Sequence, residues 1–253
     1  SYKLMGHEFF SNFSQNYRSV TFSDISIVSP AYMVDPNIMD ETGNTLDLGF
    51  RGKTNIISYD ISAFQMSYNN RIGFVQRTDQ FGSVKSVRSN IGKARINGIE
   101  SLIDFNLRNL IEDSYRFNFF INMAVINSKY TYSEENGVLG NKVEFVPLLN
   151  LKAGIFFGYS RLISNLQFTY LSEQFTDATN AVESNLSGVI GIIPSYNIFD
   201  YNSKYIHDKF DLEFGVNNFL NKIYFTRRAT GYPGPGIIPS QNRNFYLTLS
   251  VKL

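Results

Sequence analysis

Apolar and polar residues alternate most regularly near the end of the chain, between Lys209 and Leu253. The apolar positions there are Phe210, Leu212, Phe214 and Val216 and, after a loop rich in Gly and Pro, Phe245, Leu247, Leu249, Val251 and Leu253. A period of two places alternate side chains on opposite faces of a β-strand. This part of the chain therefore predicts two strands, each with one apolar and one polar face.

Similar alternation recurs along the chain and predicts ten strands. We expect them within residues 3–18, 46–51, 57–76, 99–108, 115–125, 149–157, 165–170, 199–205, 210–217 and 244–253. No run approaches the roughly 18–20 apolar residues that a transmembrane helix needs. The predicted fold class is all-β and antiparallel.

The connections between these strands alternate between short and long. We expect short turns at 54–56, 111–114, 160–161 and 207–208, and long loops at 19–43, 77–91, 133–145, 177–193 and 226–241. Regular alternation is typical of an outer-membrane barrel with all its long loops at one end, whereas a Greek-key sandwich mixes its loop lengths. We therefore predict an antiparallel up-and-down transmembrane β-barrel in the bacterial outer membrane, with polar faces toward the lumen.

Composition agrees with this interpretation. The chain has 16 Tyr and 23 Phe but no Trp, and its mean hydropathy is slightly negative at −0.16. Many aromatic rings without overall hydrophobicity suit strands with one wet and one lipid-facing side and aromatic girdles at the interfaces. The 23 Lys and Arg nearly balance the 22 Asp and Glu, which argues against a nucleic-acid partner. Without cysteine, the chain has neither a disulfide framework nor a thiolate metal site.

The sequence gives little support for catalysis or for a resident metal or cofactor. The Gly-x-Ser-x-Gly, His-Glu-x-x-His and phosphate-loop motifs are missing, and His7 and His207 lie far apart without ligand-spaced partners. We predict no catalytic residue, no metal site and no cofactor, and the protein is not expected to be an enzyme. The charged residues of the polar faces are expected to form the lumen wall, because charge near the midplane of the lipid face costs roughly 2–4 kcal/mol. These residues are Asp60, Glu100, Asp104, Arg108, Arg116, Lys152, Asp200, Lys204, Asp211 and Glu213.

Two arginines near the last long loop are the strongest candidates for ligand binding. Arg227 and Arg228, followed by Tyr232, enter a loop that contains three prolines. A guanidinium is a planar, permanently charged group suited to carboxylates, and prolines reduce the entropy lost when a loop is ordered. We predict capture of an anionic metal chelate, with Arg77, Arg88 and Lys85 of loop 77–91 as weaker candidates. The alternative for Arg227 and Arg228 is a salt bridge within the loops or a contact with lipopolysaccharide phosphates.

Several segments resemble one family of membrane proteins. Residues 215–225 (GVNNFLNKIYF) resemble the penultimate barrel strand of TonB-dependent outer-membrane receptors. Residues 94–100 (ARINGIE) and 147–151 (PLLNL) are similar to two further strands of that family. Residues 226–240 (TRRATGYPGPGIIPS) resemble the last extracellular loop of receptors of the ferric-dicitrate type from Bacteroidetes-like bacteria.

This resemblance implies a larger protein than the present chain. The family has a twenty-two-stranded barrel behind an N-terminal plug, so residues 1–253 are expected to form a single β-barrel domain that is the C-terminal half of such a barrel. The plug and the first twelve strands would be missing. The implied function is active import of a ferric chelate, either a siderophore or ferric citrate. The implied partners are the plug, a periplasmic TonB-type energy transducer and the lipid and lipopolysaccharide of the outer membrane.

Two other interpretations stay open. The first is a complete ten-stranded outer-membrane barrel that acts as an adhesin or as an omptin-like protease. A protease of that kind needs Asp/His pairs near the loop end of the lumen, and neither histidine is predicted there. The second is a soluble carbohydrate-binding β protein, which requires a second apolar layer that the single alternating face does not obviously supply.

Overall fold

The computed structural model describes residues 1–27, 30, 32–107, 114–229 and 234–252. The strands are β1 (Tyr2–Leu4), β2 (His7–Arg18), β3 (Tyr32–Val34), β4 (Glu41–Lys53), β5 (Ile57–Thr78), β6 (Val84–Asn106), β7 (Tyr115–Tyr132), β8 (Leu149–Tyr159), β9 (Leu162–Leu171), β10 (Tyr196–Ile206), β11 (Phe210–Asn217), β12 (Phe225–Ala229), β13 (Gly236–Pro239) and β14 (Asn244–Val251), and the helix is α1 (Phe22–Ile25). The all-β prediction is confirmed. No helix in the described ranges is long and apolar enough to cross a membrane.

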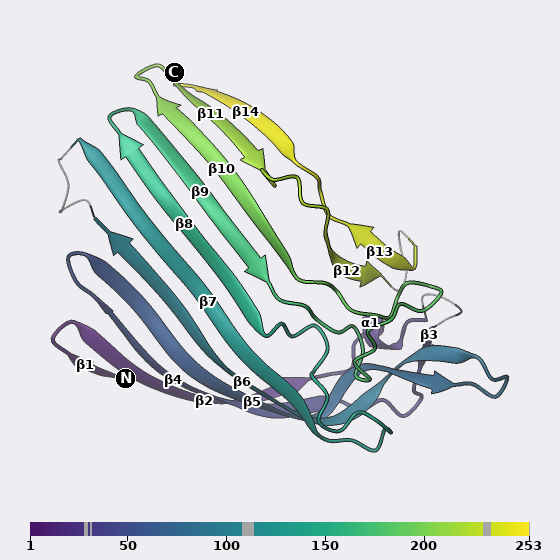
Figure 1. Cartoon of the computed structure of the whole chain (residues 1–253). Coiled ribbons are helices and arrows are strands. Elements are labelled where there is room, and N and C mark those ends of the chain that lie inside the picture. Colours follow the sequence, from purple (N-terminus) through teal and green to yellow (C-terminus); the bar gives the residue numbers. More distant parts are fainter. Residues whose placement is uncertain (28–29, 31, 108–113, 230–233, 253) are drawn as a thin grey trace.

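Twelve of the strands form one large curved sheet in which sequence neighbours are mostly also spatial neighbours, and β12 and β13 form a separate two-stranded sheet (Figure 1). The order is β1-β2-β4-β5-β6-β7-β8-β9-β10-β11-β14, every pair along it is antiparallel, and β3 adds a short parallel pairing to β6. The ten predicted strands correspond to β2, to β4 through β11, and to β14. Within the described residues β14 does not pair with β1, so the sheet is an open part of a barrel. The arrangement therefore does not support the complete ten-stranded barrel.

The short turns lie at one end of the sheet and the long connections at the other (Figure 1). Backbone hydrogen bonds link neighbouring turns, from Ile206 N to Arg161 O at 2.8 Å and from Lys252 N to Lys209 O at 2.9 Å. The second of these bonds places the C-terminal strand at the short-turn end, as predicted. The predicted turn at 111–114 lies mostly outside the described residues.

Four of the predicted segments differ from the structure. Residues 77–91 are not a loop, because β5 and β6 stay paired as far as Thr78 and Val84. Residues 3–18 are not one strand, because Met5 and Gly6 both have positive φ and form the turn between β1 and β2. The loop predicted at 19–43 contains α1 and β3. The loop predicted at 226–241 contains most of the β12–β13 hairpin. Alternation fails at 77–91 because these projecting strands do not face lipid on one side and lumen on the other.

Within the membrane-spanning part, each strand has one apolar and one polar face. Across β7 and β8 the aligned pairs Phe119 with Ile155 and Val125 with Leu149 share the apolar face. The aligned pair Asn122 and Lys152 shares the opposite face. From Tyr115 to Val125 the apolar side of β7 has about the 9–11 residues that a tilted strand needs to cross the bilayer. The polar face belongs to the lumen.

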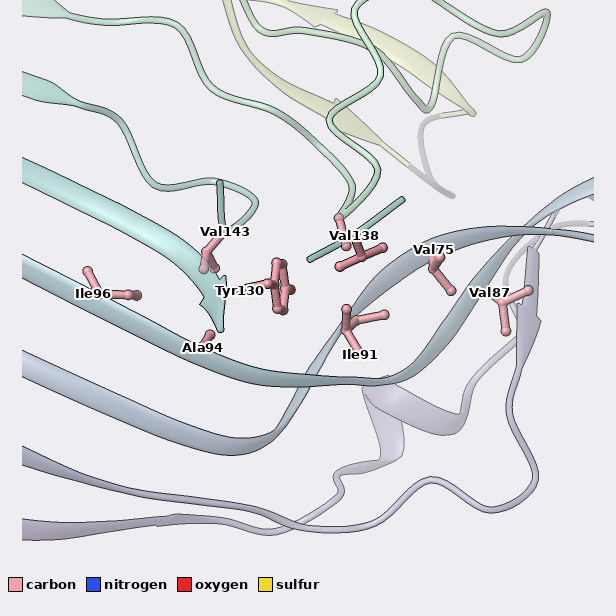
Figure 2. Packing of buried hydrophobic residues seen from close by; sticks show 9 residues of the cluster. Val75, Val87, Ile91, Ala94, Ile96, Tyr130, Val138 and Val143 are labelled. Atoms are coloured by element: carbon pink, nitrogen blue, oxygen red, sulfur yellow. The ribbon is translucent and has the colours of Figure 1, made fainter. Parts of the chain in front are cut away.

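The hydrophobic core sits at the long-loop end, on the lumen side of β5, β6 and β7 (Figure 2). Its buried members are Val75, Val87, Ile91, Ala94, Ile96, Tyr130, Val138, Val143 and Ala178. Two of them, Val138 and Val143, come from the connection between β7 and β8, and Ala178 comes from the connection between β9 and β10. This core fixes the long connections against the wall of the barrel.

Candidate ligand-binding site

The side chain of Arg228 attaches the β12–β13 hairpin to the connection between β9 and β10. Its Nη1 donates to Ser184 Oγ and to the Gly188 carbonyl, both at 2.8 Å, and its Nη2 donates to the Ile192 carbonyl at 2.9 Å. The same connection reaches β5, where Ala178 N donates to the Phe74 carbonyl at 2.8 Å. These bonds bring together segments that are far apart in the sequence.

A cavity of about 480 Å³ lies between these segments. It is lined by Phe74, Ser86, Phe145, Gln174, Thr176, Val189, Ile190, Thr226, Arg227 and Arg228. This volume is within the range of small-molecule sites, and the mixture of apolar walls with a few polar groups is typical of them. Among the described residues that line the cavity, Arg227 and Arg228 carry positive charge and none carries a carboxylate.

The two arginines differ in their surroundings. The partners of Arg228 are two carbonyl groups and a hydroxyl, so no anion neutralises its charge, and burial lowers the pKa of its guanidinium. Arg227 is exposed, and its side chain has no hydrogen bond or ion pair to any residue in the described part of the chain. The cavity therefore has a positive potential, and Arg227 retains its donors for a ligand.

Arg77 and Arg88, two of the weaker candidates, do not line this cavity. Arg77 donates to Asp35 Oδ2 at 2.9 Å and is also paired with Glu135. Arg88 donates to Asp24 Oδ1 at 2.6 Å, and its guanidinium lies 4.6 Å from the centre of the Phe74 ring. Their ligand-binding role stays a prediction, but in this arrangement both cations already hold carboxylates. Tyr232, also a predicted ligand residue, lies outside the described residues.

The histidines lie away from this cavity. The His7 ring is 2.5 Å from the Tyr59 hydroxyl, and His207 stacks on Phe210 in a short turn. Within the part of the chain that the structure describes, no three His, Asp or Glu side chains are grouped so that they could hold a metal ion.

Comparison with known proteins identifies the fold family. The family model described as TonB dependent receptor-like, beta-barrel, matches residues 2–219. The chain belongs to this family of TonB-dependent receptors. A comparison with curated proteins finds no match.

Several solved receptor structures share the fold. The unliganded ferric citrate transporter FecA is 22% identical, with a TM-score of 0.76 over 99% of this chain and 36% of its own. The copper transporter OprC is 15% identical, with a TM-score of 0.71 over 98% of this chain and 37% of its own. The ferric yersiniabactin receptor FyuA from Yersinia pestis is 16% identical, with a TM-score of 0.70 over 98% of this chain and 35% of its own. The chain thus spans just over a third of each.

Membership in the family shows that the cavity belongs to a barrel of the outer membrane. TonB-dependent receptors are outer-membrane transport proteins and not enzymes. The predictions of family, partial barrel and outer-membrane location are confirmed. In the receptor, the cavity lies at the long-loop end of the wall, beyond the apolar band.

Eight of the ten described residues that line this cavity were not predicted from the sequence, among them Phe145, Gln174 and Thr176. Thr176 is buried and exchanges hydrogen bonds with the backbone of Gly191, at 2.9 and 3.1 Å. Gln174 is also buried, and its backbone pairs with Ile193. Because these residues occupy polar loop segments without periodicity, only their tertiary position reveals them.

Phe145 separates the outer cavity from a second one. The inner cavity, of about 370 Å³, is lined by Asp47, Ser62, Phe64, Met66, Ile96, Glu100, Ile126, Phe145, Val146 and Pro147. Phe145 is the one described residue that lines both spaces. On β6, Glu100 of the inner cavity is nearer to the short-turn end than Ser86 of the outer cavity, so the inner cavity lies deeper. The outer cavity is thus lined by two arginines, and the deeper one by two acidic residues, Asp47 and Glu100.

A backbone hydrogen bond attaches Phe145 to the connection between β9 and β10, because its N donates to the Phe175 carbonyl at 2.9 Å. The φ of Phe145 is +59°, a value uncommon for a bulky residue, and the residue is 46% exposed. The preceding residue, Glu144, is buried and accepts a hydrogen bond from the Tyr130 hydroxyl at 2.7 Å. Burial raises the pKa of Glu144. Strained residues that are held in place by their surroundings often mark functional sites.

Replacing Phe145 with Ala is expected to change the size selectivity of the receptor. Without the ring the two cavities join, so a chelate too large for the outer cavity should bind at least about tenfold more tightly than to the unmodified receptor, equivalent to ~1.4 kcal/mol. Equilibrium binding of chelates of graded size to the complete receptor measures this. Phe145→Leu keeps most of the bulk and is the control. Identical selectivity in all three proteins would contradict the assignment.

Proposed function

We propose that this chain forms part of the wall and the ligand-capture surface of an outer-membrane receptor that imports an anionic ferric chelate, such as ferric citrate or a siderophore. The observation that carries the proposal is the basic cavity, in which Arg227 has no protein partner among the described residues. Iron chelates bear carboxylate, catecholate or similar oxygen donors, and a guanidinium recognises such oxygens through charge-assisted hydrogen bonds. Two of the similar structures, the ferric citrate transporter FecA and the ferric yersiniabactin receptor FyuA, are proteins for ferric chelates, which supports this choice.

The polar residues of the lumen supply the second part of the proposal. After capture, the chelate moves along the inward faces of the strands, where Asn122, Lys152 and Asp200 form a wall of mixed sign. In the complete receptor, an N-terminal plug occupies this lumen and a periplasmic TonB-type transducer supplies the energy. The present chain contributes residues 1–253 to the barrel domain of that receptor.

Binding of chelates to the purified complete receptor tests the proposal. We expect ferric citrate, which is anionic, to bind at least about tenfold more tightly than a neutral ferric hydroxamate of similar size, because only the anion gains from the arginines. The preference should shrink at high ionic strength, since salt screens partly exposed charges. Equal affinity for the two chelates, or no binding of either, would contradict the proposal.

A further inference from the structure

Two cations face each other on the outer side of the barrel wall. In the pairing of β6 with β7, Arg95 is aligned with Lys129. Both side chains are exposed, and neither makes a hydrogen bond or ion pair with another residue of the described ranges. Like charges directly opposite one another in an antiparallel pair are destabilising. An anion from outside the chain would therefore relieve the repulsion between the two cations.

The pleat of the strands shows that both side chains point away from the lumen. Their sequence neighbours Ala94, Ile96, Ser128 and Tyr130 are buried on the lumen side, where Ala94, Ile96 and Tyr130 belong to the core (Figure 2). Successive side chains of a strand point to opposite faces. The open edges of the sheet are β1 and β14, so neither lies beside this part of the surface. Beyond Val125, β7 pairs with β6 on one side, and on its other side Tyr130 N donates to the Asn141 carbonyl of the connection between β7 and β8 at 2.9 Å.

The height of the pair matches the headgroup region of the bilayer. The last apolar pair on this face is Ile99 with Val125, the amides Asn97 and Asn127 follow, and Arg95 with Lys129 comes next. Four residues of strand cover about 13 Å, or about 10 Å in height at the usual barrel tilt. The headgroups begin at the edge of the hydrocarbon core, and the long stems of Lys and Arg let the charges reach back toward it.

The described strands on the β5 side of the pair carry no compensating negative charge at this level. The neighbouring strands continue the row with Ser67, Asn44 and Gln15, all uncharged. One step farther out, Lys93 is aligned with Tyr132, whose hydroxyl donates to Glu134 Oε1 at 3.0 Å. Glu134 is thus the nearest acid on this path, and it lies beyond the cation pair.

We propose that Arg95 and Lys129 bind the phosphate group of a lipid headgroup in the outer leaflet of the membrane. One phosphate between the two side chains turns their repulsion into two favourable charge-assisted contacts, and the planar guanidinium fits phosphate oxygens with two parallel hydrogen bonds. The site is on the opposite side of the wall from the chelate cavity. It is therefore independent of the transported ligand.

Titration of the delipidated complete receptor with lipid A tests this site. We expect phosphorylated lipid A to bind the double variant Arg95→Gln/Lys129→Gln roughly ten- to a hundredfold more weakly than the unmodified receptor, from the loss of charge-assisted contacts. Lipid A without phosphates should bind both proteins equally. Lys152→Gln, which removes a cation from the lumen face, is the matched control and should leave binding unchanged.

Three results would overturn the proposal. The first is equal binding of phosphorylated lipid A to the double variant and the unmodified receptor. The second is the same loss in Lys152→Gln, and the third is competition by inorganic phosphate as effective as that of the lipid. The variant in which the two cations are swapped, Arg95→Lys/Lys129→Arg, should still bind phosphorylated lipid A. Because the double variant removes repulsion between exposed groups, its barrel should remain folded, which resistance to unfolding in SDS without heating verifies.

Discussion

Replacing Arg227 with Gln in the complete receptor should weaken binding of an anionic ferric chelate by roughly ten- to a hundredfold. A hydrogen bond to a charged group contributes about 1.5–3 kcal/mol, and Gln keeps similar size without the charge. Arg227 has no partner in the described part of the chain, so its loss removes a ligand contact without disturbing a neighbour. Equilibrium binding at low and high ionic strength measures the effect.

Arg228 should behave differently, although it stands next in the sequence. It fastens the β12–β13 hairpin to carbonyl groups of the β9–β10 connection, so Arg228→Gln should loosen this attachment as well as weaken binding. Hydrogen exchange of residues 225–229 separates the two effects, because Arg227→Gln should leave that exchange unchanged.

Lys252 supplies the control for both variants. It is paired with Asp211 at 2.7 Å near the short-turn end, far from the cavity, so Lys252→Gln should leave affinity unchanged. Unchanged affinity in Arg227→Gln would show that this arginine serves the loops or the lipopolysaccharide, as the alternative interpretation holds.

The barrel wall could be predicted from the sequence because the membrane imposes a simple rule on each strand. Lipid on one face and lumen on the other force a period of two, and the alternation of Phe210, Leu212 and Phe214 reports it directly. The rule ends where the strands leave the bilayer. Beyond that level, β5 and β6 continue as a hairpin whose faces meet loops or water, and residues 77–91 lose the alternation. Their polar composition alone then suggested a loop.

The roles of the loop cations could not be predicted, because their partners are distant in the sequence. Arg77 is bonded to Asp35, 42 residues away in the sequence, and to Glu135, 58 residues away. Arg88 is bonded to Asp24, 64 residues away. No local pattern distinguishes such a paired arginine from an unpartnered one like Arg227. The same limit explains why Phe145 was missed, since its position between two cavities depends on the packing of three connections.

Asp24 connects three segments at the long-loop end and should be the most sensitive position among the loops. Its carboxylate accepts from Arg18 of β2 at 2.7 Å, from Arg88 of β6 at 2.6 Å and from the Thr21 backbone at 3.0 Å. The side chain is only 1% exposed. Removing one partner of a buried ion pair leaves an uncompensated charge, at a cost of about 3–5 kcal/mol.

Asp24→Asn should therefore release the segment 19–27 from the β5–β6 hairpin. Hydrogen exchange of this segment should accelerate strongly while exchange of the membrane-spanning strands stays unchanged. The control is Asp208→Asn, which breaks the exposed pair with Arg161, where side-chain exposures are 77% and 45%. That change should cost less than about 1 kcal/mol. Equal exchange in the two variants would contradict a special role for Asp24.

The same attachment should depend on pH in one direction only. Burial alone would raise the pKa of Asp24, but hydrogen bonds from Thr21, Arg18 and Arg88 outweigh burial and hold the pKa below its ordinary value of 3.8. A carboxyl whose pKa is lower in the folded state stabilises that state fully above its unfolded pKa, and the stabilisation is lost as the pH falls toward the folded pKa.

The rate of hydrogen exchange of residues 19–27, corrected for the intrinsic rate, should stay constant from neutral pH down to about pH 4 and rise below it. In Asp24→Asn it should be fast throughout, with no further rise at acid pH. A parallel acid-induced rise in both proteins would assign the effect to other carboxyl groups.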